Sequence, residues 1–246
     1  MSIICTTYTP DGIVMGADSR VTVNMNLTNT QDKNQHMMHT FTMSDNAQKV
    51  FLLSKVQAGI SAVSPAIGDD IQGLSTFIRN FEKNEINPTD GIDIIAEKLQ
   101  RQITNAATFH LAGYEGSEQY FYSITKNECK RLNINGGTIQ HGITCSGEAY
   151  AFQKIMGTDP KPALNFKAYS VHDAADLTEF IINTTVGLLR FEMKPKTCGG
   201  AVDLLVLTPD GAFWKKHKFM DSSFIPMPAS QRSSVYITDK NGNTVN

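Results

Sequence analysis

IICTTYTPDGIVMGADSR, residues 3–20, is the stretch of this 246-residue chain that predicts its fold most strongly. The first part, Ile3 to Thr9, is rich in β-branched residues, which favour strands. Pro10-Asp11-Gly12 is strong turn chemistry, and an apolar run follows from Ile13 to Ala17. The sequence therefore predicts a β-hairpin at the N-terminus.

Outward from this hairpin, the sequence predicts more strands and then two helices. Val50 to Leu53 and Val56 to Val63 have the composition of a second pair of strands. Apolar residues recur at intervals of three and four between Pro65 and Glu82, where Pro65 permits a helix start. Pro88-Thr89-Asp90 precedes a second such pattern that runs from Ile92 to Ile103.

The second half of the chain repeats this order of strands followed by helices. Four strand-like runs are separated by turn residues and predict a meander; they are His110 to Tyr114, Gln119 to Ile124, Lys130 to Ile134 and Thr138 to Cys145. Helices are expected from Glu148 to Met156 and from Ala174 to Phe191. Two last strands, Ala201 to Leu207 and Ala212 to Lys216, are joined by Pro209-Asp210-Gly211.

Segregated antiparallel strands and helix pairs favour the α+β class over a parallel, doubly wound sheet. We expect a four-layer αββα sandwich, with two antiparallel sheets face to face and helices on both outer faces. Residues 1–217 form a single domain in this interpretation. Its polar insertion, about residues 24–46, is a long loop or an extra hairpin around His36 to Met43. The tail, residues 218–246, is expected to run over the surface or to reach a neighbour.

Composition excludes several classes of function. A formal net charge of -2 leaves no basic surplus for nucleic acid or anionic lipid, so we expect neither as a partner. The sequence shows no apolar membrane span and no signal-peptide pattern, which predicts a cytoplasmic protein. The cysteines are expected to be reduced, with no disulfide framework and no zinc spacing, so neither a metal nor a cofactor is expected; they are Cys5, Cys129, Cys145 and Cys198.

Several motifs, taken in order and spacing, resemble the β-subunits of proteasomes and their bacterial ring-forming relatives. The resemblance covers about residues 2–217 and lies in five places: Pro10-Asp11-Gly12 to Gly16-Ala17-Asp18-Ser19-Arg20, Gln48-Lys49-Val50, Leu111-Ala112-Gly113-Tyr114 with Tyr120-Phe121-Tyr122, Cys145-Ser146-Gly147, and Cys198-Gly199-Gly200-Ala201-Val202-Asp203. It implies an N-terminal-nucleophile hydrolase fold. It also implies self-assembly into a ring or double ring, with an ATP-dependent unfoldase as a possible partner.

The resemblance implies that Ser2 is the nucleophile. In that family the strand before the turn begins with a catalytic threonine, and an ungapped count back from Asp11-Gly12 reaches Ser2. Initiator methionine is usually removed before so small a residue, which would give Ser2 both a hydroxyl and a free α-amine. Cys5, Thr6 and Thr7 are competing nucleophiles, but their use requires an internal cleavage and shortens the strand.

Lys49 and Asp18 match the family's lysine and aspartate. The α-amine, with an ordinary pKa of about 7.7–8.0, can act as the base for the hydroxyl. An adjacent ammonium lowers the pKa of that amine by like-charge repulsion, and this is the role implied for Lys49. Asp18 is expected to pair with Lys49. Lys33 is rejected because it lies in the polar insertion.

The remaining site residues are also implied by the resemblance. Ser146 matches a serine that hydrogen-bonds near the terminal amine, and it is also a candidate N-cap for the helix that follows. The backbone N–H of Ala62 is the expected donor to the oxyanion. Cys198 and Gly199 are expected to support the site, with Cys198 in place of a serine as a weak hydrogen-bonding group.

Two departures from the family pattern bear on activity. An aspartate is usual three residues before the serine that precedes Gly-Gly, and Pro195 occupies that position here. Glu192, one turn upstream, is a candidate substitute. The second departure is serine instead of threonine at the nucleophile position, although other N-terminal-nucleophile amidases use serine.

Three functions follow as hypotheses. The first is a peptidase or amidohydrolase subunit in which Ser2 attacks an amide of a peptide substrate. The second is an inactive, ring-forming structural subunit in which Met1 is retained. The third is a small-molecule amidase with a closed pocket.

Overall fold

In the computed structural model, which describes residues 2–28, 36–63, 73–104, 106–160 and 162–218, the N-terminal hairpin forms where the turn chemistry predicts it. β1 (Ile3–Thr9) pairs antiparallel with β2 (Gly12–Ala17), and every residue of both strands is buried. Burial on both faces explains why these strands are almost continuously apolar or β-branched instead of alternating. The hairpin is therefore an interior element.

This hairpin is the centre of a five-stranded antiparallel sheet with the strand order β12-β1-β2-β13-β14. β12 (Gly142–Gly147) pairs with β1, β13 (Asp203–Thr208) pairs with β2, and β14 (Gly211–Lys216) lies at the edge. Ile4 thus lies opposite Ala17 on one side and Ser146 on the other. The start of β1 therefore lies between its own hairpin partner and β12, a strand far away in the sequence.

A second five-stranded antiparallel sheet is a meander in the order β5-β6-β7-β8-β9. Its strands are β5 (Val50–Leu53), β6 (Ala58–Val63), β7 (Thr108–Glu115), β8 (Glu118–Thr125) and β9 (Cys129–Arg131). Consecutive strands are hydrogen-bonded neighbours throughout, as expected for sequential antiparallel strands.

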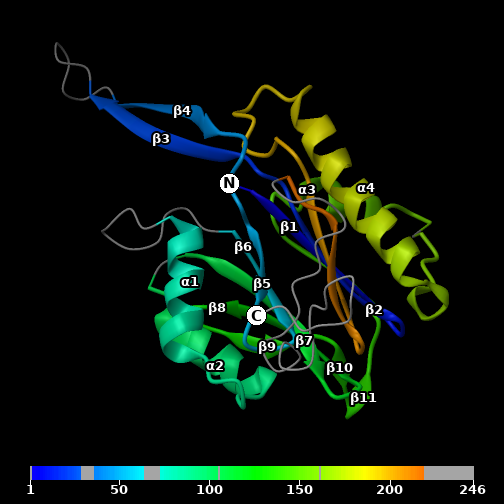
Figure 1. Cartoon of the computed structure of the whole chain (residues 1–246). Helices are drawn as coiled ribbons and strands as arrows, with labels where there is room; N and C mark the ends of the chain where they lie inside the picture. Colours follow the sequence, from blue (N-terminus) through cyan, green and yellow to red (C-terminus); the bar gives the residue numbers. More distant parts are fainter. Residues whose placement is uncertain (1, 29–35, 64–72, 105, 161, 219–246) are drawn as a thin grey trace, which may run out of the picture.

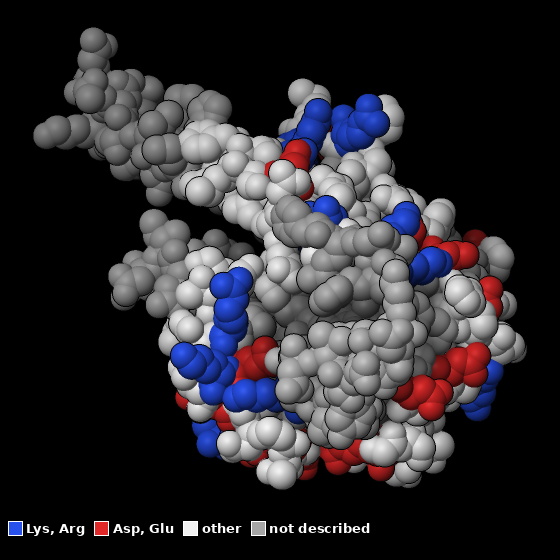
Figure 2. All heavy atoms as spheres, viewed as in Figure 1, with Lys and Arg blue, Asp and Glu red and all other residues white. Residues whose placement is uncertain are grey.

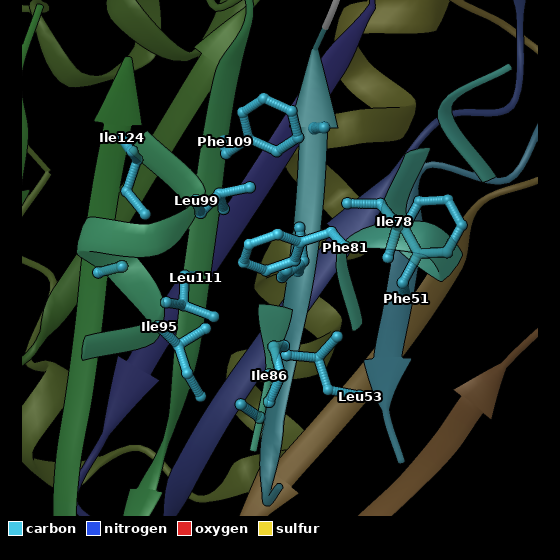
Figure 3. Close-up of a cluster of buried hydrophobic side chains, with 14 of the residues drawn as sticks. Phe51, Leu53, Ile78, Phe81, Ile86, Ile95, Leu99, Phe109, Leu111 and Ile124 are labelled. Atoms are coloured by element: carbon cyan, nitrogen blue, oxygen red, sulfur yellow. The ribbon is translucent and has the colours of Figure 1, made fainter. Parts of the chain in front are cut away.

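Two helices cover one face of the second sheet. The apolar faces of α1 (Leu74–Glu85) and α2 (Ile92–Gln102) pack on β5 to β8 around a cluster that includes Phe81, Leu99 and Phe109 (Figure 3). The spacing of three and four predicted these helices. The expected start of the first helix at Pro65 lies outside the described residues.

The other two α-helices of the described residues belong to the first sheet. α4 (Val171–Leu189) packs along β1 and β2, and α3 (Tyr150–Met156) packs on α4, after which a short 3₁₀ turn (Phe166–Ala168) leads into α4 (Figure 1). α4 begins at Val171 because Ser170 and Asp173 form a reciprocal capping box, three residues earlier than the apolar pattern suggested.

A third group of side chains lies where the two sheets meet. It combines Ile4, Met15 and Leu205 of the first sheet with Ala112 and Phe121 of the second. The described chain is therefore mixed α+β with antiparallel sheets, which confirms the expected class.

Two predicted strands are broken into shorter pieces. In place of strands 130–134 and 138–145 the structure has β9, β10 (Ile134–Asn135), β11 (Thr138–Ile139) and β12. Gly136 and Gly137, with φ of 55° and 78°, reverse the chain between β10 and β11. The Asn133 side chain accepts from the Phe121 N–H and donates to the Gln119 carbonyl, so it replaces ladder bonds there.

The polar insertion forms a hairpin instead of a loop. β3 (Val21–Thr28) pairs with β4 (His36–Ser44) as a separate two-stranded ribbon that projects from the body of the molecule (Figure 1). In the sequence it lies between Arg20 and Lys49, which are both at the candidate site described below.

Charged side chains of both signs are interspersed over the face in Figure 2. Within the described ranges, no helix is long and apolar enough to cross a membrane. The backbone N–H of Lys218 donates to the Asp203 carboxylate at 3.0 Å, which holds this residue on the body of the protein. The rest of the predicted tail, residues 219–246, lies outside the described residues.

Candidate functional site

The centre of the site is the carboxylate of Asp18, which directly follows β2 and is 1% exposed. Oδ1 accepts from Lys49 Nζ at 2.7 Å and from the backbone N–H of Ile3 at 3.1 Å. Oδ2 accepts from the backbone N–H groups of Gly199 at 2.9 Å and Arg20 at 3.1 Å. Four donors from four residues therefore satisfy one buried carboxylate.

Lys49 immediately precedes β5 of the second sheet and is also buried. Besides Asp18, its ammonium donates to the Arg20 carbonyl at 2.6 Å. Burial lowers the pKa of Lys49 because the charged form is desolvated, and the negative charge of Asp18 opposes that shift. The ion pair between Asp18 and Lys49 bridges the two sheets.

A second buried ion pair lies beside the first. Asp203, opposite Ala17 in the β13–β2 ladder, pairs with the ammonium of Lys218, whose side chain is 5% exposed. The positive charge of Lys218 further lowers the pKa of Lys49. Placing residue 218 in a surface tail was therefore wrong, because this lysine neutralises a carboxylate that is buried at the site.

Ser2 lies directly against this centre. It is 7% exposed, its carbonyl accepts from the Glu148 N–H at 2.8 Å, and the next amide along the chain, that of Ile3, donates to Asp18. Gly147, with φ 86°, makes this close approach possible, since a Cβ there would lie 1.9 Å from the Ser2 carbonyl oxygen. Ser2, Asp18 and Lys49, expected together from the sequence, are brought together.

Ser146 lies on the neighbouring strand but makes a contact that the sequence did not indicate. Its Oγ is 2.9 Å from Nε2 of His110, and Nδ1 of the same ring is 2.9 Å from Thr6 Oγ1. Ser146 does not cap α3, because Ala149 is the N-cap and no side chain caps that helix. The N-cap interpretation was therefore wrong.

The backbone N–H of Ala62 is not free for an oxyanion. It donates to the Lys49 carbonyl at 3.0 Å, next to the pairing between β5 and β6. An amide committed in this way cannot bind substrate without breaking its own bond. In this conformation the Ala62 N–H is therefore not available as the expected oxyanion donor.

Cys198 and Gly199 lie beside the carboxylate as expected. Gly199 donates its N–H to Asp18, and its carbonyl accepts from the Ser19 N–H at 2.9 Å. Cys198 is 2% exposed, and burial raises the pKa of its thiol, with a further increase from the negative charge of Asp18. Its sulfur is therefore a neutral group close to the ion pair.

The competing nucleophiles lie in the interior of β1 and are fully buried. Burial raises the pKa of the Cys5 thiol, and its sulfur is 3.0 Å from that of Cys145, where both cysteines remain free thiols. Thr7 Oγ1 is 2.7 Å from Thr178 Oγ1. Neither the Cys5 nor the Thr7 environment activates a nucleophile, because a thiolate needs a lowered pKa and a hydroxyl needs an adjacent base. Thr6 does have a base beside it, since its Oγ1 is 2.9 Å from His110 Nδ1, but its side chain is fully buried where the two sheets meet.

Glu192, the candidate substitute for the missing aspartate, pairs with Lys194 at 2.8 Å and is not one of the residues that bond to Asp18 or Lys49.

Glu148, whose N–H bonds to the Ser2 carbonyl, brings a second carboxylate close to the chain terminus. That carboxylate accepts from Thr197 Oγ1 at 2.9 Å and is mostly buried. Its only sequence signal was its position directly after the Cys145-Ser146-Gly147 motif. Lys33 lies outside the described residues.

Arg20 and Asp45 close the base of the projecting hairpin. The guanidinium donates from Nε at 2.6 Å and from Nη2 at 2.8 Å to the two carboxylate oxygens of Asp45. Gly200 passes so closely that a Cβ would lie 2.3 Å from the Asp45 carbonyl oxygen. The hairpin base is thus fixed to the segment that supplies Gly199.

Searches of protein families and of curated proteins find no family model and no curated protein that matches this chain. In the part of the chain that the structure describes, no three His, Cys, Asp or Glu side chains form a group that could hold a metal ion. The assignment of function therefore depends on the geometry of the site.

Proposed function

We propose that this chain is a proteasome-like N-terminal-nucleophile hydrolase subunit in which Ser2, freed by removal of Met1, attacks amide bonds. The observation that carries the proposal is the buried Asp18–Lys49 ion pair, whose carboxylate also binds the amide N–H of Ile3, the residue next to Ser2. A fixed ammonium beside the chain terminus is what this chemistry requires.

The proposed fold is the four-layer αββα sandwich of that hydrolase class. It is supported by the packing of α1 and α2 on one sheet, α3 and α4 on the other, and the apolar cluster where the sheets meet. Since Ser2 and Asp18 adjoin strands of one sheet and Lys49 adjoins a strand of the other, the nucleophile would lie at one end of this sheet-to-sheet contact.

In the proposed reaction the α-amine of Ser2 takes the hydroxyl proton while Oγ attacks the carbonyl carbon of the substrate. The protonated amine gives that proton to the leaving nitrogen as the C–N bond breaks, leaving an ester on Ser2. Water then loses a proton to the amine and attacks the ester. The carboxylic acid leaves, and the proton returns to Oγ.

Lys49 assists by its charge and not by exchanging protons with substrate. Its ammonium, held by Asp18 and the Arg20 carbonyl, lowers the pKa of the nearby α-amine by like-charge repulsion. A larger fraction of the amine is then the neutral base at physiological pH. Lys218 adds to the positive charge on this side of the site.

An inactive, ring-forming subunit is the second candidate. It is favoured by Pro195 where the family has an aspartate, and by the Ala62 N–H, which is committed to the Lys49 carbonyl. Assembly into a ring or double ring, a peptide substrate and a partner unfoldase are expectations that follow from the resemblance, and they belong to the proposal.

Hydrolysis of a peptide panel and of small acyl amides tests the proposal. Wild type and Ser2→Thr, which keeps a hydroxyl beside the amine, should both turn over at least one substrate, whereas Ser2→Ala should not. Preference for peptides would favour the peptidase over the small-molecule amidase. Full activity of Ser2→Ala would show that the nucleophile is another residue.

A further inference from the structure

Between the two sheets lies a buried polar cluster that the proposed reaction does not use. It consists of His110 of β7 with Thr6 of β1, Ser146 of β12 and Ser61 of β6, and His110, Thr6 and Ser61 are each 0% exposed. A buried imidazole in an apolar sheet contact is costly unless both ring nitrogens are hydrogen-bonded. Both are bonded here, at 2.9 Å each.

The imidazole is held in one place. Its two nitrogens bond to the neighbouring strands β1 and β12 of the first sheet, and Phe121 meets the ring edge-on with centroids 5.2 Å apart at 81°. Rotation of the ring would break both hydrogen bonds. Ser146 therefore has a fixed partner on the side away from the chain terminus.

The neutral imidazole also occupies one side of the Ser146 hydroxyl. Burial lowers the pKa of His110 to about 3, so one ring nitrogen donates and the other accepts at physiological pH. Either Ser146 donates to Nε2 and presents its lone pairs elsewhere, or it accepts from Nε2–H and its own proton is free. In each case the remaining hydrogen-bonding capacity of Ser146 points away from His110.

That capacity faces the same space as Ser2. Side chains alternate along a strand, and Ile4 and Thr6 share the face of β1 that meets the second sheet. Continuing this alternation to Ser2, the residue before β1, places its side chain on the same face. Ser146 lies directly opposite Ile4, two residues from Ser2, and shares that face. The Ser146 hydroxyl is therefore between His110 and the end of the strand that carries Ser2.

We propose that His110 is a positioning residue for the hydrolysis, which orients the Ser146 hydroxyl toward the α-amine of Ser2. The inference rests on the proposed function. It assigns to His110 the task of fixing Ser146 in a site where Pro195 provides no carboxylate.

Ser61 provides a matched control. It lies opposite His110 in the β6–β7 ladder and is as deeply buried, but its Oγ has no hydrogen-bond partner among the described residues. Ser61→Ala removes a hydroxyl from the same cluster without removing a bond to the imidazole.

The first arm of the test is independent of activity. Nitrogen NMR of the full-length protein with ¹⁵N-labelled histidine, assigned by loss of the signal in His110→Gln, should show a single neutral tautomer from pH 5 to 8. Ser146→Ala should shift the Nε2 resonance and Ser61→Ala should not. A His110 signal that titrates in this range, or one indifferent to Ser146→Ala, would overturn the proposal.

The second arm is kinetic. His110→Phe, and the milder Thr6→Val, should lower kcat with little change in KM, on the order of 10²-fold for His110→Phe. In a Ser146→Ala background His110→Phe should cause no further loss, because both changes remove one interaction. The inference about His110, but not the proposed function, would be overturned by either of two results. One is a double variant whose loss of kcat is the product of the two single losses, and the other is full activity of a folded His110→Phe. A wild type without turnover would overturn the proposed function as well, while the NMR result would still decide the hydrogen bond.

Discussion

At the scale of single residues, Asp18 shows why a buried ion pair persists here. Moving two charges out of water costs more than their mutual attraction returns unless their other hydrogen-bonding capacity is also satisfied. Asp18 has this support from three backbone N–H groups in addition to Lys49. Removing Lys49 would therefore leave a carboxylate that is still hydrogen-bonded but no longer neutralised.

Lys49→Met keeps most of the side-chain volume and removes the charge. We expect hydrolysis to be lost and the free energy of unfolding to fall by about 3 kcal/mol, because a buried carboxylate is left without its counter-charge. Urea unfolding and turnover measure the two effects. Lys98→Met is the control, since its pair with Asp90 is more exposed and should cost less than about 1 kcal/mol. Equal losses in the two variants would show that the Asp18–Lys49 pair has no special role in stability.

His110 should make the protein sensitive to acid. The unfolded imidazole binds a proton below pH 6.5, whereas the folded one binds it only near pH 3, so the unfolded state holds more protons in this window. The contribution of His110 to the free energy of unfolding is fully present above pH 6.5. It should fall by up to about 1.4 kcal/mol per pH unit as the pH decreases toward 3. Denaturant melts of wild type and His110→Gln between pH 4 and 7 measure the slope. The free energy of unfolding should depend less steeply on pH in the variant, by the amount expected for the uptake of about one proton. Equal slopes in the two proteins would contradict the buried neutral imidazole.

Sequence reasoning predicted part of the site at this scale. Asp18, Lys49 and Gly199 could be named because each lies within a short motif, and all three converge. His110 could not be named, since its bond to Ser146 depends on how two sheets are aligned across a sequence separation of 36 residues. In the sequence, His110 is one residue of a predicted strand, and nothing in its position indicates this partner.

At the scale of secondary-structure elements, the end of β12 determines where Ser2 lies. Gly147 has φ 86° and passes so close to Ser2 that no side chain fits there. The next N–H, that of Glu148, can then bond to the Ser2 carbonyl. A backbone turn, and not a side chain, positions the residue proposed as nucleophile.

Gly147→Ala should therefore lower stability and activity together. The left-handed backbone strain alone costs about 1–2 kcal/mol, and the collision with the Ser2 carbonyl adds to it. Gly187→Ala is the control, because a Cβ added to this glycine of α4 would meet no atom within 4 Å, and the variant should gain about 0.5–1 kcal/mol. Thermal melts and turnover of both variants test this. An active, fully stable Gly147→Ala would show that the close approach does not position Ser2.

Elements with strong local signals were predicted well. Pro10-Asp11-Gly12 and Pro209-Asp210-Gly211 indicated both hairpins of the first sheet, because their turn chemistry is local. The region from Lys130 to Gly147 was predicted poorly. There the Asn133 side chain takes over strand hydrogen bonds, and such tertiary contacts leave no periodic pattern in the sequence.

At the scale of the whole molecule, the contact between the sheets assembles the site. Ser146 lies in the first sheet, and Ser2 and Asp18 adjoin its strands. His110 lies in the second sheet, and Lys49 adjoins its first strand. The Asp18–Lys49 and Ser146–His110 contacts both cross this boundary. The apolar cluster between the sheets therefore fixes the distances on which the proposed chemistry depends.

The intact mass of the natively expressed protein, with and without a fluorophosphonate or β-lactone acylating probe, tests the central claim most directly. We predict a mass lower by one methionine and a single adduct on Ser2, absent in Ser2→Ala and retained in Ser61→Ala. Retained Met1 and no adduct would contradict the proposed hydrolase and favour the inactive ring-forming subunit.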